Sequence, residues 1–276
     1  MTKKQKAVLH VLTYFSLFEY PPCLDDIWAF LPHKMSKNAL KQLLSDLVDS
    51  RHIITNGERF AFPQNSDTFS IFRAKQQHSK RYLDSSKFYL RIACMLPSIC
   101  MLSLSGSIAM MNAGKEDDID LFVVTRPHNI WRTRFYLLLM KKLFSLFSPI
   151  HKKMCINLIF NTNDLEMAKH KKNEFVGHEL LQTKVIYNKN YTYEQLVNRN
   201  TWVKQLFPNV VIISTKKYIN RDYKKSIFFV FIEKIFKYIQ TRWLSKKKYS
   251  WNQERGNLWL IQKDYEKTIP FALKRV

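Results

Sequence analysis

Four acidic side chains stand within five positions of a strongly basic chain: Glu116, Asp117, Asp118 and Asp120. The whole chain has 45 Lys and Arg against 22 Asp and Glu. The stretch DIDL alternates polar and apolar residues, and alternate residues of a strand share a face, so Asp118 and Asp120 should point the same way. Paired carboxylates repel each other and resist burial, and a divalent cation relieves both effects. The pattern therefore indicates a site for Mg²⁺ or Mn²⁺.

A Gly-Ser pair precedes this acidic stretch. Ten residues separate Gly106-Ser107 from Asp118, and the apolar segment SICMLSLS comes before the pair. Glycine lets the backbone approach a ligand closely. Ser107 offers a hydroxyl and an N–H at the predicted start of a helix, a position that favours phosphate. The pair predicts a phosphate-binding turn beside the carboxylates.

Gly-Ser, ten residues and then an Asp-x-Asp flanked by apolar residues resembles the signature of the nucleotidyltransferase superfamily, which includes DNA polymerase beta and the aminoglycoside nucleotidyltransferases. The resemblance implies that Gly106 and Ser107 hold a nucleoside triphosphate. It also implies that Asp118 and Asp120 hold the metal ions that bridge its phosphates. A surface acidic loop ahead of a core strand is the plainer interpretation, and Asp120, which interrupts an apolar run, argues against it.

The segments VLHVLTYFSLFEYP and GHELLQTKVIYN extend the resemblance to a bacterial group of nucleotidyltransferase-like proteins with an N-terminal winged helix. That superfamily usually supplies a third carboxylate from a later strand. The candidate strand, Met154–Phe160, has Asn157 at its centre, which could ligate a metal weakly but is a poor base. Glu179 is the candidate replacement, with a plain helix-face charge as the alternative. His178 is interpreted as structural, and Asp117 as facing away from Asp120.

The elements that must position these residues follow from periodicity and turn signals. Three helices and then two short strands around Asn56-Gly57 have the order of a winged helix over residues 1–63. A connecting helix follows over 64–97, then a catalytic domain over 98–190 and a helical region over 191–276. Helices are expected at 129–147, 174–183, 193–206, 227–243 and toward the end of 258–273. The expected fold class is α+β, with a mixed nucleotidyltransferase sheet.

Composition limits the alternatives. A chain of 276 residues with 46% hydrophobic residues can bury a sizeable core. Its four scattered cysteines predict reduced thiols in a cytoplasmic protein. The longest apolar runs, Phe135–Met140 and Ile227–Ile232, are six residues each, far short of the roughly 18 that a membrane span needs. The formal net charge of +23 suits a polyanionic partner, and biased base composition explains it equally well.

Two functions are consistent with these observations. The first is an enzyme that moves a nucleoside monophosphate from a nucleoside triphosphate, which we take to be ATP, to a hydroxyl, releasing pyrophosphate. The acceptor is left open among a protein, a small molecule and a nucleic acid. The second is a winged-helix DNA- or protein-binding module whose degenerate nucleotidyltransferase domain only senses nucleotide. The predicted recognition helix carries only Lys37 and Lys41 before Asp46 and Asp49, which favours the enzyme.

Overall fold

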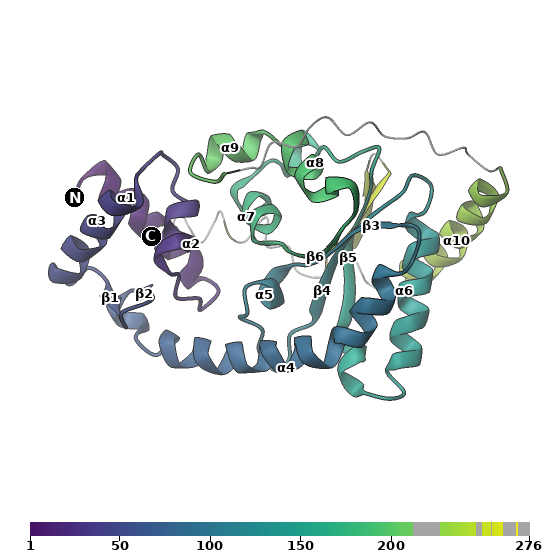
Figure 1. The fold of residues 1–276 in the computed structure, drawn as a ribbon, viewed down its shortest axis with the longest axis horizontal. Coiled ribbons are helices and arrows are strands. Elements are labelled where there is room, and N and C mark those ends of the chain that lie inside the picture. The colour runs from purple at the N-terminus through teal and green to yellow at the C-terminus, as the bar shows by residue number, and fades with distance from the viewer. Residues whose placement is uncertain (212–226, 247–249, 255, 262–268, 270–276) are drawn as a thin grey trace.

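The computed structural model describes residues 1–211, 227–246, 250–254, 256–261 and 269, and Figure 1 shows its arrangement. A six-stranded sheet lies at the centre, in the order β6-β3-β4-β5-β8-β7. Its strands are β3 (Ile99–Leu104), β4 (Ile119–Thr125), β5 (Met154–Asn161), β6 (Lys184–Asn188), β7 (Ser250–Glu254) and β8 (Asn257–Ile261). Only β4 and β5 are parallel neighbours among these strands. The expectation of a mixed α+β fold is confirmed.

The chain begins with three helices and a hairpin: α1 (Lys3–Ser16), α2 (Leu24–Ala29), α3 (Lys37–Asp49), β1 (Ile54–Thr55) and β2 (Phe60–Ala61). Ser36 caps α3, as its position predicts, by accepting the Ala39 N–H at 3.2 Å. The hairpin loop is longer than a two-residue Asn-Gly turn. Asn56 Oδ1 accepts the N–H groups of Glu58 and Arg59, at 3.1 and 2.9 Å, so that one side chain organises a four-residue loop.

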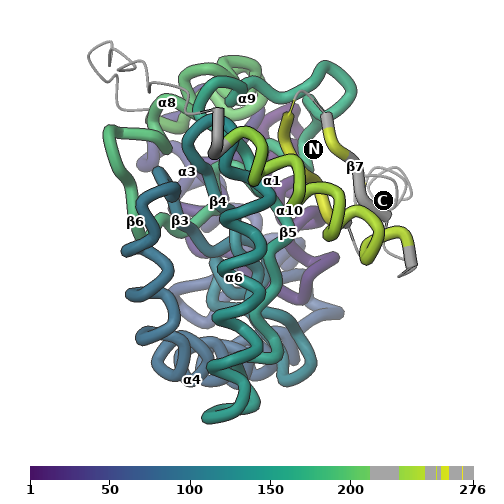
Figure 2. Tube along the Cα trace, turned by 90° about the vertical axis from the view of Figure 1, so that its right-hand side faces the viewer, coloured from purple at the N-terminus to yellow at the C-terminus, as the bar shows by residue number. Residues whose placement is uncertain are grey.

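Helices cover both faces of the sheet. The long helix α4 (Thr68–Cys94) connects the N-terminal helices to the sheet, and with α6 (Ile130–Phe144) and α10 (Ile227–Lys246) it covers one face (Figure 2). The opposite face packs against α7 (Glu174–Gln182), α8 (Thr192–Arg199) and α9 (Trp202–Leu206). Alternation along β4 supplies both cores, because Leu121 and Val123 face α6 while Phe122 and Val124 face the other side.

One hydrophobic core joins the N-terminal helices to the rest of the chain. His178 of α7 is stacked between Tyr14 of α1 and Phe30, with ring centroids 3.7 and 3.9 Å apart. Burial lowers the pKa of His178 well below its usual value, so its imidazole is neutral and acts as a packed ring. The expected boundary at residue 63 is therefore crossed by buried contacts, and removing residues 1–63 would expose apolar surface. Their separability stays a prediction.

Three features of the later part of the chain differ from the sequence prediction or lie partly outside the described residues. The single helix expected over 193–206 is two helices, α8 and α9. Asn200 interrupts it because its side chain accepts the Met167 N–H and donates to the Leu165 carbonyl, at 2.9 and 2.8 Å. The strands β6 and β7 were not expected. The helix expected at the end of 258–273 falls mostly outside the described residues, which show β8 at its start.

We expect His178→Ala to lower the free energy of unfolding by about 2–4 kcal/mol, because it empties the space between two stacked rings. Urea unfolding near neutral pH measures the effect. His52→Ala is the matched control, since the His52 side chain is exposed and its loss should change stability by no more than about 0.5 kcal/mol. Equal effects of the two substitutions would show that the stacked histidine does not join α7 to the N-terminal helices.

Candidate active site

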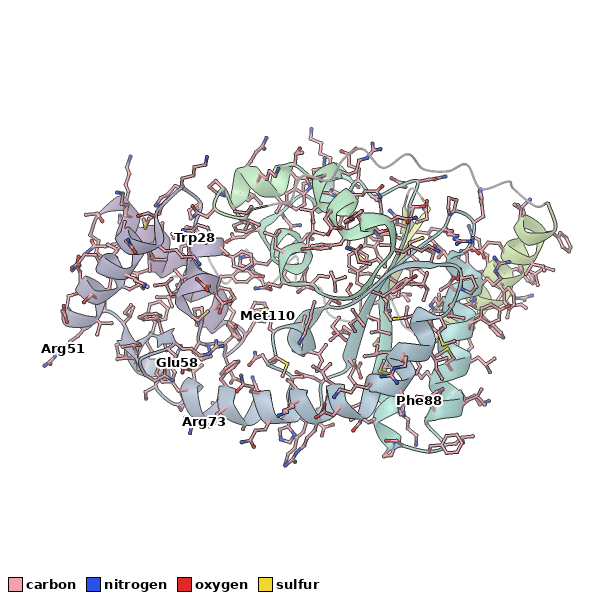
Figure 3. All side chains as sticks on the ribbon, viewed as in Figure 1. Trp28, Arg51, Glu58, Arg73, Phe88 and Met110 are labelled. Carbon is pink, nitrogen blue, oxygen red and sulfur yellow. The ribbon has the colours of Figure 1, made fainter. Side chains whose placement is uncertain are left out.

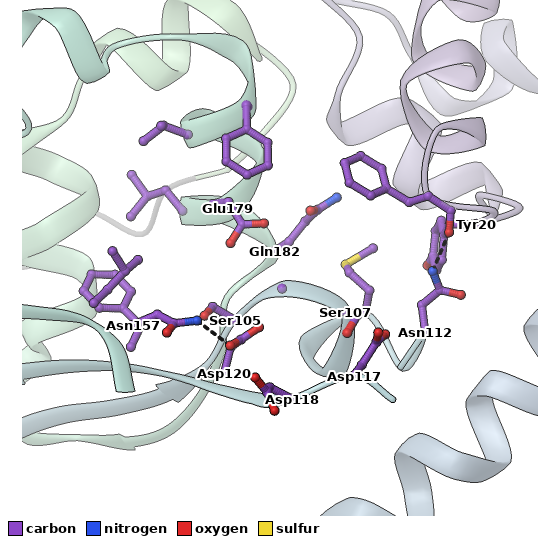
Figure 4. A pocket seen from close by; sticks show the side chains of 18 of the residues that line it. Tyr20, Ser105, Ser107, Asn112, Asp117, Asp118, Asp120, Asn157, Glu179 and Gln182 are labelled. Atoms are coloured by element: carbon purple, nitrogen blue, oxygen red, sulfur yellow. Dashed lines mark hydrogen bonds between the residues drawn. The ribbon is translucent and has the colours of Figure 1, made fainter. Parts of the chain in front are cut away.

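A cavity of about 650 Å³ lies between the N-terminal helices and the sheet (Figure 4). Every residue to which the sequence assigned chemistry lines this cavity: Gly106, Ser107, Asp118, Asp120, Asn157 and Glu179. They come from four elements that meet at the cavity: α5 (Gly106–Ala109), the beginning of β4, β5 and α7. Residues far apart in the sequence therefore meet at one place.

The turn after β3 presses its backbone against Asp120. Gly106 has φ +60°, and a Cβ at this position would lie 2.9 Å from Asp120 Oδ2. Both the backbone conformation and this contact exclude a larger residue. The Ser105 N–H donates to the Asp120 carbonyl at 3.0 Å, which holds the end of β3 beside β4. Ser107 follows within the same turn and lines the cavity.

The two aspartates open onto the same cavity, as strand alternation predicted. Asp118 immediately precedes β4 and Asp120 is its second residue. Burial and, to a smaller extent, the charges of Glu179, Asp118 and Asp117 together raise the pKa of Asp120 to about 7. Burial also raises the pKa of Asp118, an effect that the cations Lys141 and Lys153 oppose. The ionised carboxylates are thus crowded and poorly solvated.

Asn157 reaches Asp120 through a bulge in β5. The register of β4 against β5 shifts here, because Leu121 pairs with Ile156 and Phe122 with Leu158, which leaves Asn157 without a partner in the ladder. Its amide N–H donates to Asp120 Oδ1, and its oxygen accepts the Cys155 thiol at 2.8 Å. The predicted role of Asn157 as a metal ligand would need the amide to turn over, because only its oxygen can bind a cation.

Glu179 reaches the site from α7. Burial raises the pKa of its carboxyl group to about 7, and the nearby Gly106 N–H partly opposes that rise. Two features fix the helix that carries it. Asn173 caps α7 by accepting the Val176 N–H at 2.9 Å, and His178 is stacked between aromatic rings of the N-terminal region. Glu179 is therefore half-buried at a defined place beside the Gly-Ser turn, and is not a plain charge on an exposed helix face.

The sequence did not reveal the apolar half of the cavity. Its walls are aromatic and aliphatic side chains from α1 and the following turn, from α7 and from β8: Tyr14, Phe15, Leu17, Phe18, Phe175, Val176, Leu180, Trp259 and Leu260. Their helical spacing in α1 and α7 gave an apolar stripe, which predicts burial but not a cavity. The cavity therefore has one acidic end and one apolar end.

Further carboxylates line the acidic end. Glu19, Glu116 and Asp117 join the acids already described, and Lys75 is the one cation among the described lining residues, paired with Glu19 at 2.7 Å. The sequence predicted that Asp117 faces away from Asp120. It lines the cavity, and its Oδ2 also accepts the Gly114 N–H at 3.0 Å, so it shapes the loop as well. This end of the cavity is strongly negative.

The carboxylates of the cavity suit a Mg²⁺ ion that is held partly by the protein and partly by the phosphates of a bound substrate. Among the residues that the structure describes, no cluster of three or more His, Cys, Asp or Glu is arranged to hold a metal ion by itself. Mg²⁺ is commonly bound by one or two carboxylates together with substrate phosphates. Asp118 and Asp120, crowded and half-buried at the mouth of one cavity, supply that number of carboxylates.

We expect Asp120→Asn to raise the free energy of unfolding at pH 8 by about 1–3 kcal/mol, because it removes a poorly solvated charge. The folded-state pKa of about 7 lies above the ordinary value of 3.8, so the charge destabilises the fold only at higher pH. The advantage of the variant should shrink as the pH falls through 7 and vanish near 4. Urea unfolding at pH 8, 6 and 4 measures it.

The exposed side chain of Glu116 gives the matched control, and Glu116→Gln should show no such pH-dependent difference from the wild type. An Asp120→Asn variant that is less stable than the wild type at pH 8 would mean that the carboxylate is stabilised where it stands.

The comparisons with known proteins supply no relative. No protein-family model matches the chain, and no curated protein and no solved structure resembles it at a significant level. A functional assignment therefore depends on the residues of the cavity and on their geometry.

Proposed function

We propose that the chain is a metal-dependent nucleotidyltransferase with a nucleotidyltransferase-type sheet and an N-terminal winged helix. The observation that carries the proposal is the contact between the Gly-Ser turn and the Asp-x-Asp pair, where the backbone of Gly106 leaves no room for a Cβ beside Asp120 Oδ2. The groups that we propose to bind phosphate and cations therefore lie side by side at the mouth of one cavity.

The proposed reaction joins a nucleoside monophosphate to a hydroxyl. The acceptor oxygen forms a bond to the α-phosphorus of the triphosphate while the bond to the bridging oxygen of pyrophosphate breaks. Two Mg²⁺ or Mn²⁺ ions, when bound, would stabilise the attacking and leaving oxygens. Asp118 and Asp120 hold these ions, and the Ser107 hydroxyl and backbone N–H hold the phosphates.

Glu179 is the proposed general base. A carboxyl group with a pKa of about 7 is about half ionised near neutral pH, so a substantial fraction of it can accept the hydroxyl proton. The Gly106 N–H, a phosphate donor in this proposal, lowers the pKa of Glu179 against the effect of burial. A triphosphate bound at that N–H would lie beside the Glu179 carboxylate, so that the base and the substrate meet at the Gly-Ser turn.

The apolar end of the cavity suggests where the rest of the substrates lie. The triphosphate has to meet the acidic end, which leaves the space beside Phe18 and Phe175 for the base of the nucleotide or for a largely apolar acceptor. Because Leu17 and Phe18 follow directly from α1, the N-terminal region forms part of the binding wall. This gives residues 1–63 a role in substrate binding that needs no DNA.

Asn157 favours the second candidate, a nucleotide sensor without catalysis. It stands where the superfamily usually places a third carboxylate, and its N–H already satisfies Asp120. The DNA-binding version of this candidate has less support, because Lys37 on α3 is paired with Asp25 at 2.6 Å and lies over the Trp28 ring. Turnover decides between the enzyme and the sensor.

We expect the wild type to release pyrophosphate from a nucleoside triphosphate with Mg²⁺ or Mn²⁺, and to label an acceptor with the nucleotide. Asp118→Asn and Asp120→Asn should each reduce the rate by about a hundredfold or more, because each removes negative charge from the cation site. Glu116→Gln is the matched control, since it removes a carboxylate from the same cavity without touching Asp-x-Asp. Radiolabelled triphosphates and a panel of protein, small-molecule and oligonucleotide acceptors measure the rates.

The pH dependence of the reaction rate tests whether Glu179 is the general base. The wild-type rate should rise with pH through about 7, as the Glu179 carboxyl loses its proton, and Glu179→Gln should abolish most of the rate together with this limb. Asn157→Ala should have a smaller effect. Binding of nucleotide without turnover, whatever the acceptor, would reject the enzyme and support the sensor.

A further inference from the structure

The rotation of α10 about its axis is fixed by polar side chains that point inward. Glu233 accepts the N–H groups of Trp131 and Arg132 at the start of α6, at 2.7 and 3.0 Å. About two turns later, Gln240 donates to the Trp131 carbonyl and accepts from Arg134, both at 2.7 Å. These bonds bury the polar side of α10 against α6, at the start of a helix where a carboxylate is favoured.

The outward side of α10 is apolar as a consequence. Phe231 and Tyr238 are each 61% exposed, and Ile239 and Ile235 are 53% and 42% exposed. Their spacing of i, i+4, i+7 and i+8 forms one stripe along the helix. Ile235 and Ile239 belong to this exposed stripe, while Phe236 and Leu244 of the same helix pack on the core. A surface helix ordinarily turns its apolar residues toward the core, so a second, exposed apolar stripe indicates a contact surface.

A second group of exposed apolar side chains lies on α6, which runs beside α10 at the same end of the molecule (Figure 2). The exposed apolar residues of α6 and of the turn that follows it are Tyr136, Leu139, Leu143, Leu146 and Phe147. Phe147 is 88% exposed and Leu146 is 78% exposed, which are extreme values for such side chains. We refer to these five residues and the α10 stripe together as the end face.

The charged side chains that α6 and α10 expose around the end face are Lys and Arg. Lys142 on α6 and Lys234, Lys237 and Arg242 on α10 are exposed. The one acidic residue in either helix is Glu233, which points inward. Exposed aromatic and aliphatic side chains with Lys and Arg around them are the composition of helices that lie in the interface of an anionic membrane. The end face therefore has both the apolar and the electrostatic component of such binding.

We propose that the end face binds the surface of an anionic lipid bilayer. A second copy of this chain is a poorer occupant, because two-fold pairing would bring the cations of both copies together. A nucleic-acid backbone would engage the cations but leave Phe231, Tyr238 and Phe147 in water. The binding is peripheral, since no helix in the described part of the chain is long and apolar enough to cross a membrane.

The experiment is flotation of the full chain with vesicles of phosphatidylcholine alone or with about a third phosphatidylglycerol. The wild type should float with the anionic vesicles, and less so at high salt. Phe231→Ser/Ile235→Ser should weaken the apparent affinity by about tenfold or more, because it removes apolar contact without changing the charge. Lys234→Gln/Lys237→Gln should weaken it by about fivefold per lysine.

Val211→Ser is the matched control, since Val211 is 81% exposed but lies outside the end face, and it should float like the wild type. Thermal unfolding confirms that each variant is folded. Failure of the wild type to float, or equal flotation of the wild type and Phe231→Ser/Ile235→Ser, would overturn the proposal. A dimer that the same serine substitutions dissociate would overturn it as well, and assign the end face to a contact between copies.

Discussion

The half-buried carboxylate of Asp120 is the constraint on which the rest of the candidate site depends. A carboxylate that loses water needs donors or cations around it. Of its neighbours, the Asn157 amide donates to Asp120 and the Gly106 turn packs against it, while Asp118 adds a second negative charge. The first two neighbours require a local departure from regular structure. Gly106 adopts a positive φ, and β5 takes a bulge so that Asn157 can point at Asp120.

The same constraint extends to the N-terminal region through α7. Glu179 is useful only where it meets the Gly-Ser turn, and α7 owes its position to the stacked contacts of His178 with Tyr14 and Phe30. Gly177 permits a close approach as well, because a Cβ there would lie 2.9 Å from the Phe207 ring. The N-terminal helices therefore hold α7 in place by packing against it, and Phe18, which follows α1, lines the cavity.

Sequence reasoning succeeded where the signal was local. The strands β3, β4 and β5, the cap at Ser36 and the convergence of Asp118 and Asp120 follow from alternation and from the properties of single residues. It failed where tertiary contacts decide. Asn200 breaks a helix to satisfy a distant loop, and β6 is an edge strand whose residues alternate only between exposed and half-buried.

The segregation of charge explains why so basic a chain gathers acids in one place. Cations outside the cavity act on the acidic end: Lys141 and Lys153 lower the pKa of Asp118 against the effect of burial. For the proposed enzyme, the acidic end of the cavity would repel a free triphosphate and attract divalent cations, so that a nucleotide would enter as its metal complex. The excess of Lys and Arg elsewhere would raise the local concentration of such a polyanion. A basic exterior and an acidic cavity are therefore compatible parts of one electrostatic arrangement under the proposed function.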